Sequence, residues 1–245
     1  MVCFITASPF IDGAERALLN PDNQFLERMY AVLPPNPRVL FVASNPDDHA
    51  GTCRFGADVF CAFAEANITF SRYTVLDATN AVSAKKLVHS SDFIIFAGGH
   101  VPTQNAFLNA IRMQELLKDF DGVLLGISAG SMNMAKTVYV QPEEPGESHP
   151  DFRRFAPGMG VTRFQILPHY QKVKDNILDG KRLFEDVTYA DSMGHTFFAL
   201  PDGSYIYQDH EETTLLGKGY RLKNGIMEQL TGDGDVLNLA NIRYI

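Results

Sequence analysis

The chain has 245 residues, of which 45% are hydrophobic and 20% are charged, and these proportions are typical of a folded globular protein. We expect one domain over residues 1–245. Lys and Arg number 21 against 29 Asp and Glu, so the net charge of -8 argues against a surface that follows nucleic-acid phosphates.

The sequence also lacks the patterns of secretion and of membrane insertion. The apolar run at residues 2–5 has no basic residue before it, as a signal peptide would. The longest uncharged stretch, residues 93–111, contains Gly98, Gly99 and several amides, which excludes a membrane-spanning helix. The three cysteines form neither a disulfide framework nor a metal-ligand spacing. We therefore expect a cytoplasmic protein without a bound metal.

Short apolar runs alternate with stretches of helical spacing in the first half of the chain. This alternation predicts an α/β fold of three layers, in which helices cover both faces of a mostly parallel central sheet. The expected strands are residues 3–6, 39–43, 69–76, 93–96 and 123–127, and the expected helices are about 22–33, 56–66, 81–89, 103–118 and 129–136.

The second half is less regular. Residues 141–157 contain four prolines and four carboxylates without apolar periodicity, which predicts a long surface loop. A strand at 161–167 and a helix at 174–187 are expected next. Residues 196–230 then form short runs separated by Asp202-Gly203, Gly217 and Asn224-Gly225, which predict antiparallel hairpins.

The clearest chemical signal is the sequence GISAG at residues 126–130, which follows an apolar strand and opens a helix. This is the context of a G-x-S-x-G nucleophile elbow, so we expect Ser128 to be a nucleophile in a strained turn. In the structural alternative, Gly126 and Gly130 only permit close packing and Ser128 caps the helix.

A serine nucleophile also needs an oxyanion site and a base. Gly98, Gly99 and His100 directly follow another buried strand, at the sheet edge where open α/β folds hold ligands. We therefore expect the N–H groups of Gly99 and Ala129 to form an oxyanion hole, and His100 to contact substrate. The alternative for this segment is an ordinary glycine turn.

His169 is the preferred base among seven histidines, because it directly follows a predicted strand and so belongs at the same edge. Asp202 ends a later apolar run and would accept the Nδ1 proton of His169. The alternative for Asp202 is an ordinary Asp-Gly turn. Glu143 or Glu144, in the long loop, is the competing carboxylate.

Together these segments resemble the dipeptidase E family of serine peptidases, also called aspartyl dipeptidases, over nearly the whole chain. The resemblance implies a class I glutamine amidotransferase-like, flavodoxin-like fold. It matches Ser128 to the family nucleophile and His169 to the family base. Asp202 stands where relatives carry Glu in a Leu-Pro-Glu-Gly segment. Other accounts of the family place the third residue in the loop after the elbow, here near Glu143.

Two departures from the family pattern concern specificity. The usual Gly-Gly-Gly-Asn-Thr segment reads AGGHV at residues 97–101. The arginine that helps aspartyl dipeptidases select an N-terminal Asp has no clear counterpart, and Arg182 or Lys181 is the nearest candidate. A preference for Asp would need a locally basic pocket built from Lys172, Lys181 or Arg182.

The leading functional hypothesis is a serine exopeptidase that cleaves short peptides, among them dipeptides with N-terminal Asp, through an acyl-enzyme and without a cofactor. The second is an α/β-hydrolase-type esterase that uses Ser128 with His210 and either Asp191 or Asp202. The third is a non-catalytic protein that holds a small molecule in the same cleft. We expect a small peptide substrate, no nucleic-acid or membrane partner, and a homodimer as an open alternative to a monomer.

Overall fold

The computed structural model describes residues 1–240, so the last five residues of the predicted domain lie outside the described part. Strands and helices alternate along its first half, as predicted. These elements are β1 (Val2–Thr6), η1 (Asp22–Gln24), α1 (Phe25–Val32), β2 (Arg38–Val42), α2 (His49–Glu65), β3 (Arg72–Leu76), η2 (Ala78–Ser83), α3 (Ala84–His89), β4 (Phe93–Phe96), α4 (Val101–Ala110), α5 (Met113–Leu116), β5 (Val123–Ile127) and α6 (Ala129–Met134).

The second half contains mostly short strands. Its elements are β6 (Thr137–Tyr139), β7 (Phe155–Pro157), β8 (Gln165–Leu167), α7 (Tyr170–Val173), β9 (Ile177–Leu178), β10 (Lys181–Arg182), the π-helical turn η3 (Leu183–Thr188), α8 (Tyr189–Asp191), β11 (Thr196–Ala199), β12 (Tyr205–Gln208), β13 (Thr213–Leu216), β14 (Gly219–Lys223), β15 (Ile226–Thr231) and β16 (Val236–Asn238).

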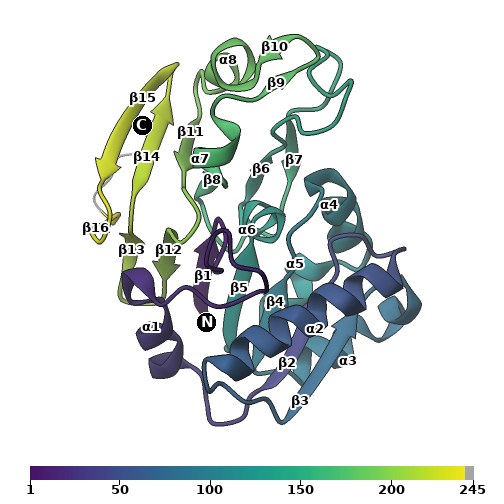
Figure 1. Ribbon diagram of the computed structural model, residues 1–245. Helices are drawn as coiled ribbons and strands as arrows, with labels where there is room; N and C mark the ends of the chain where they lie inside the picture. The colour runs from purple at the N-terminus through teal and green to yellow at the C-terminus, as the bar shows by residue number, and fades with distance from the viewer. Residues whose placement is uncertain (241–245) are drawn as a thin grey trace.

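The central sheet has eight strands in the order β16-β13-β12-β1-β5-β4-β2-β3 (Figure 1). The five strands from β1 to β3 in this order run parallel. The remaining three are antiparallel additions beyond β1. The mostly parallel sheet predicted from the sequence is therefore confirmed, and β4 and β5 are neighbours within its parallel part.

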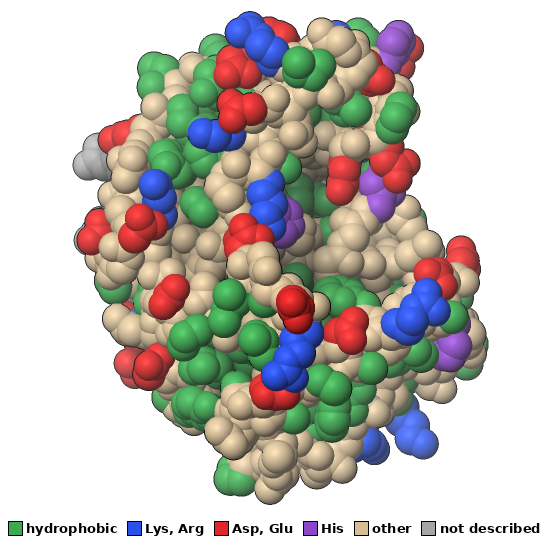
Figure 2. All heavy atoms as spheres, in the orientation of Figure 1, with side chains coloured by type: hydrophobic (Ala, Val, Ile, Leu, Met, Phe, Trp, Pro, Cys, Tyr) green, Lys and Arg blue, Asp and Glu red, His purple; other side chains and the backbone are tan. Residues whose placement is uncertain are grey.

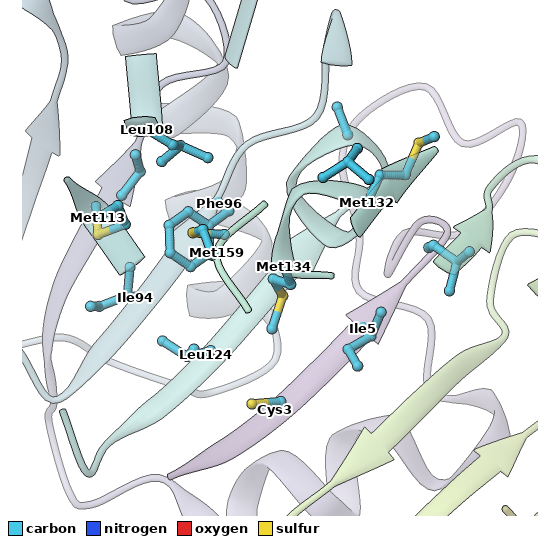
Figure 3. Packing of buried hydrophobic residues seen from close by; sticks show 14 of the residues in the cluster. Cys3, Ile5, Ile94, Phe96, Leu108, Met113, Leu124, Met132, Met134 and Met159 are labelled. Atoms are coloured by element: carbon cyan, nitrogen blue, oxygen red, sulfur yellow. The ribbon is translucent and has the colours of Figure 1, made fainter. Parts of the chain in front are cut away.

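Alternate residues of the central strands enter two separate cores. On one face, Ile94, Phe96 and Leu124 pack with buried side chains of α3 to α6, and Figure 3 shows this cluster with its methionines. On the other face, Phe93 and Leu125 pack with side chains of α1 and α2. Because both faces are covered, these strands are apolar at every position, and the layers are α/β/α.

A second sheet, β15-β14-β11-β8, lies beside the first. One of its faces has a small core of its own that includes Leu167 and Phe197, and its other face, with Ile166 and Phe198, packs in the first core. In the second sheet β8 and β11 are parallel neighbours, with Ala199 opposite Leu167. The prediction placed His169 at the edge of the main sheet, and this is wrong, because the strand that carries it belongs to the second sheet. The chain crosses from the second sheet to the first between β11 and β12.

The helix predicted at 174–187 is wrong over most of its length, and only residues 183–187, within η3, are helical. This segment contains the two-residue strands β9 and β10, which pair antiparallel around Asp179-Gly180, and then the turn η3. Both turn residues have positive φ, 50° and 77°, as a tight hairpin requires. The Asp-Gly pair was the signal for this hairpin, and the apolar spacing around it suggested a helix instead.

Other predicted helices differ in their ends. Helix α2 begins seven residues earlier than expected, where the Asp48 side chain accepts a hydrogen bond from the Gly51 N–H at 2.9 Å. The helix expected at 103–118 is divided into α4 and α5 by Arg112, which has a left-handed φ of 56°. The strand expected at 161–167 is only β8, because Val161 and Thr162 bond to the Met134 carbonyl instead.

Only one of the three predicted hairpin turns joins paired strands. Asn224-Gly225 does join the paired strands β14 and β15. Asp202-Gly203 and Gly217 each connect strands of different sheets, so they are crossovers rather than hairpin turns. The loop predicted at 141–157 is irregular except for β7, which pairs with β6 at its end. No helix within residues 1–240 has the length and apolarity needed to span a membrane.

Candidate active site

Ser128 lies in a strained turn between β5 and α6. Its backbone has φ 50° and ψ -111°, and its N–H donates to the carbonyl of Thr6 on the neighbouring strand β1 at 3.2 Å. The glycines on either side allow the tight turn, since a Cβ on Gly126 would approach Ser131 and a Cβ on Gly130 would overlap the carbonyl oxygen of Phe96. The Ser128 side chain makes no capping bond to α6, which excludes the capping alternative.

His169 brings its imidazole to Ser128 from the end of β8. Its Nε2 lies 2.9 Å from Ser128 Oγ, a hydrogen-bond distance. The residue has a left-handed φ of 57° and precedes α7, so the chain turns sharply where the ring leaves the backbone. The base predicted from the sequence is therefore in contact with the predicted nucleophile.

Asp202 lies on the far side of the imidazole. Its Oδ1 is 2.6 Å from His169 Nδ1, and its side chain is only 4% exposed. Burial acts to raise the pKa of Asp202, but hydrogen bonds from His169 and Lys172 outweigh burial and lower the pKa to about 2. The backbone N–H of Asp202 donates to Gln171 Oε1 at 3.1 Å. This bond holds the start of the connection between β11 and β12. Asp202 is thus a permanent anion next to the ring.

Lys172 was one of three candidates for a basic substrate pocket, and the structure pairs it with two carboxylates instead. Its Nζ lies 2.8 Å from Asp202 Oδ2 and 2.6 Å from Asp12 Oδ1. Lys172 follows His169 by three residues, so one helical turn brings both side chains to the same carboxylate. That spacing was the available signal, but nothing in the sequence indicated that Asp12 would meet them.

The two residues predicted to supply the oxyanion hole lie close to Ser128, since Gly99 lines the same cleft and Ala129 is its neighbour in the chain. Gly99 follows β4 and Ala129 follows Ser128, and β4 and β5 are neighbouring strands, as the oxyanion prediction requires. Among the described residues, neither N–H donates to a protein acceptor. Gly99 has a φ of 150°, and a Cβ there would lie 2.5 Å from Ser44 Oγ, so this position requires glycine.

A cleft with a volume of about 180 Å³ opens next to Ser128. Its polar lining comes from Ser128, His169, Gln141, Glu143 and Asn176. The apolar lining comes from α4 and α6, from Pro142 and Pro168, and from the segment that contains β9 and η3. Figure 2 shows a hollow on this face with histidine, acidic and basic side chains along its sides. The long loop and the β9 segment thus form walls of the cleft.

The two residues predicted to bind substrate lie outside this lining. His100 has Nδ1 2.8 Å from Thr103 Oγ1 and Nε2 3.0 Å from Glu147 Oε1, so it joins the long loop to α4. The guanidinium of Arg182 pairs with Asp186 at 2.7 Å, and its side chain is 64% exposed. These contacts do not support the predicted role of His100 and Arg182 in substrate binding.

His210, the base of the esterase alternative, and Asp191, one of its two candidate acids, make their contacts away from the serine. His210 lies in the β12–β13 turn beside Asp121, which precedes β5 and so marks the opposite edge of the sheet. Asp191 accepts hydrogen bonds from Tyr139 and Arg154. The geometry therefore does not assemble this second set of residues around Ser128.

One group of potential metal ligands occurs among the described residues. Ligand atoms of His100, Glu144 and Glu147 lie within 4.8 Å of one another. Hydrogen bonds inside the loop already account for much of this arrangement, since Glu147 also accepts the N–H groups of Glu143 and Glu144. The absence of a bound metal stays a prediction.

Comparison with known proteins identifies the family to which the chain belongs. The model of peptidase family S51 matches residues 18–216, which is most of the chain and includes the three side chains of the hydrogen-bonded series. None of the curated proteins compared with the chain matches it.

Solved structures support the fold. A crystal structure described as a candidate peptidase E protein from Listeria monocytogenes EGD-e superimposes with a TM-score of 0.57 at 13% identity, over 94% of this chain and 98% of that one. At this identity the likeness shows the flavodoxin-like fold alone. The Argonaute protein from Methanocaldcoccus janaschii aligns with a TM-score of 0.25 at 12% identity, over 93% of this chain and 50% of that one, which is too low to compare folds. By its family match the chain belongs to peptidase family S51 and is a serine peptidase.

Proposed function

We propose that the protein is a serine exopeptidase of short peptides in which Ser128, His169 and Asp202 form the catalytic relay. The observation that carries this proposal is the continuous series of hydrogen bonds from Ser128 Oγ through His169 Nε2 and Nδ1 to Asp202 Oδ1, with distances of 2.9 and 2.6 Å. This is the order of contacts that a nucleophile, a base and an orienting acid require.

In this mechanism Ser128 Oγ attacks the peptide carbonyl while His169 Nε2 accepts the hydroxyl proton. The buried Asp202 carboxylate holds the proton on Nδ1 and stabilises the imidazolium that forms. The N–H groups of Gly99 and Ala129 donate to the oxyanion of the tetrahedral intermediate. His169 then protonates the leaving amine, and water hydrolyses the acyl-enzyme by the reverse proton transfers. The steps need no cofactor.

The size of the cleft supports a short substrate. A space of about 180 Å³ beside Ser128 holds a side chain and part of a backbone, and loop residues 141–143 form one wall. A long polypeptide would have to displace this loop. We therefore propose di- and tripeptides as the substrate class.

Selection of an N-terminal Asp, which the family resemblance implies, has less support. No Lys or Arg among the described residues lines the cleft, so the contact that would hold an acidic side chain is missing from its walls. Dipeptides with N-terminal Asp stay in the substrate set to be tested, next to neutral and basic ones.

The test is a mass-spectrometric assay of a dipeptide panel with acidic, neutral and basic first residues, for the wild-type protein and Ser128→Ala. Cleavage that disappears in Ser128→Ala would support the proposal, whereas equal cleavage by both would overturn it. A fluorophosphonate probe separates the non-catalytic hypothesis, since an activated Ser128 is labelled and an inert one is not. His169→Ala and His210→Ala then separate the peptidase relay from the esterase alternative.

A further inference from the structure

The cleft beside Ser128 contains a carboxylate that the catalytic relay does not use. Glu143 is the acidic residue in its lining, and its backbone N–H is held by Glu147 Oε2 at 2.8 Å. Within residues 1–240, the Glu143 carboxylate itself has no cation and no hydrogen-bond donor as a partner. The third position of the relay is already filled, because His169 Nδ1 contacts Asp202.

The surroundings of Glu143 disfavour its negative charge. The cleft walls partly desolvate the carboxylate and raise its pKa, and the nearby Glu147 and Glu144 act in the same direction, while His100 and His169 oppose them. Glu143 and His169 line the same cleft, so the carboxylate belongs to the space beside the reaction centre. A positively charged ligand would offset the repulsion from Glu144 and Glu147. It would also replace the stabilisation that water gives to the charged carboxylate of Glu143.

The basic side chains near the cleft are all engaged outside it. Lys172 binds Asp12 and Asp202, Lys181 donates to the carbonyl of Ser148 at 2.9 Å, and Arg182 pairs with Asp186. The binding space is therefore lined by one carboxylate and by neutral groups. Such a space attracts a cation and repels an anion.

We propose that the Glu143 carboxylate binds a cationic group on the first residue of the peptide and thereby disfavours peptides that begin with Asp or Glu. This inference rests on the proposed exopeptidase function. In a dipeptide the α-ammonium is attached to the carbon next to the carbonyl that Ser128 attacks, so a carboxylate in the same cleft meets it without a long reach. A basic side chain on the first residue is the other source of the same charge.

The two sources are distinguished by matched ligands. Ala-Ala and N-acetyl-Ala-Ala differ in the α-ammonium, whereas Lys-Ala and norleucyl-Ala differ in the side-chain charge at similar length. Asp-Ala and Asn-Ala test the exclusion of a negative charge. Dissociation constants are measured by calorimetry with Ser128→Ala, so that binding is observed without turnover.

An ion pair in a partly exposed cleft contributes modestly, so we expect the cationic member of at least one pair to bind roughly fivefold to tenfold more tightly. Asn-Ala should likewise bind more tightly than Asp-Ala. Glu143→Gln in the same background should remove both differences. Glu144→Gln is the matched control, since this neighbouring carboxylate does not line the cleft, and it should retain them.

A charge reversal provides the opposite prediction. Glu143→Lys should make Asp-Ala the tighter ligand of the Asp and Asn pair. Equal binding within every pair, differences that persist in Glu143→Gln, or no detectable binding of any peptide would each overturn the inference. Failure of the proposed function would be recognised separately. In that case the wild-type protein would cleave no peptide in a Ser128-dependent way, whatever the binding measurements show.

Discussion

Lys172 binds the carboxylate oxygen of Asp202 that His169 leaves free. The two contacts, 2.8 Å to Oδ2 and 2.6 Å to Oδ1, use both oxygens of one buried carboxylate. A carboxylate held at both oxygens cannot rotate, so its hydrogen bond to the imidazole keeps one direction. Asp12 holds the ammonium from its other side and balances its charge.

We expect Lys172→Met to slow the reaction of Ser128 with a fluorophosphonate. A hydrogen bond to a charged group contributes about 1.5–3 kcal/mol, so the rate constant should fall by roughly tenfold to a hundredfold. Lys172→Arg, which keeps the charge, should recover part of the rate. Lys174→Met is the matched control, because Lys174 is 48% exposed against 51% for Lys172 and, within residues 1–240, its one ion pair is with Asp175. An unchanged rate in Lys172→Met would show that Asp202 needs no such support.

Asp202→Asn is expected to have a much larger effect. An amide in this position would favour the wrong imidazole tautomer, and the corresponding loss in serine peptidases is about four orders of magnitude in turnover. Single-turnover labelling and steady-state cleavage should both report it. Asp175→Asn, at a mostly exposed carboxylate that approaches Lys174, should behave as the wild type. A loss below tenfold would transfer the role of third residue away from Asp202.

Gly99→Ala should reduce activity without unfolding the protein. The added Cβ would lie 2.5 Å from Ser44 Oγ and 2.8 Å from Ser44 Cβ, and the φ of 150° is strained for alanine, so the Gly99 N–H must move. Loss of one oxyanion donor costs roughly a hundredfold to a thousandfold in turnover. Circular dichroism checks the fold while turnover is measured. Full activity in a folded Gly99→Ala would exclude this N–H as a donor.

The depressed pKa of Asp202 predicts an acid-dependent stability. Because the pKa falls from its ordinary value of 3.8 to about 2, the folded state gains stability above about pH 4 and loses it as the pH falls towards 2. The gain is about 2 kcal/mol in the free energy of unfolding. Urea titrations of wild-type protein and Asp202→Asn should therefore converge at pH 2 and diverge at pH 5. Parallel curves over this range would contradict the stabilised carboxylate.

The sequence predicted the parts of the site that depend on local patterns. Ser128 and Gly99 each follow a strand that is apolar at every position, and such strands indicate a parallel sheet whose carboxyl edge collects them. His169 and Asp202 were found for the same reason, although their strands β8 and β11 belong to a second sheet. The pattern marks the end of a strand but does not record which sheet the strand joins.

What the sequence did not predict depends on contacts between distant segments. Asp12 meets Lys172 across 160 positions of the chain, and no periodicity encodes that meeting. The hairpin around Asp179-Gly180 was missed because two residues per strand are too few for an alternating pattern. The positions of Arg182 and Lys181 followed from that hairpin, so their predicted role in the cleft could not be judged beforehand.

The assembly of the site from two sheets has a consequence for inactivation. Ser128 and Gly99 follow strands of the main sheet, whereas His169 and Asp202 follow strands of the second sheet. One continuous core joins the two sheets, because Ile166 and Phe198 of the second sheet are buried in the same cluster as Ile5 of the main sheet. The sheets therefore cannot separate without opening this core, and on heating turnover should be lost together with helical and strand content rather than before it.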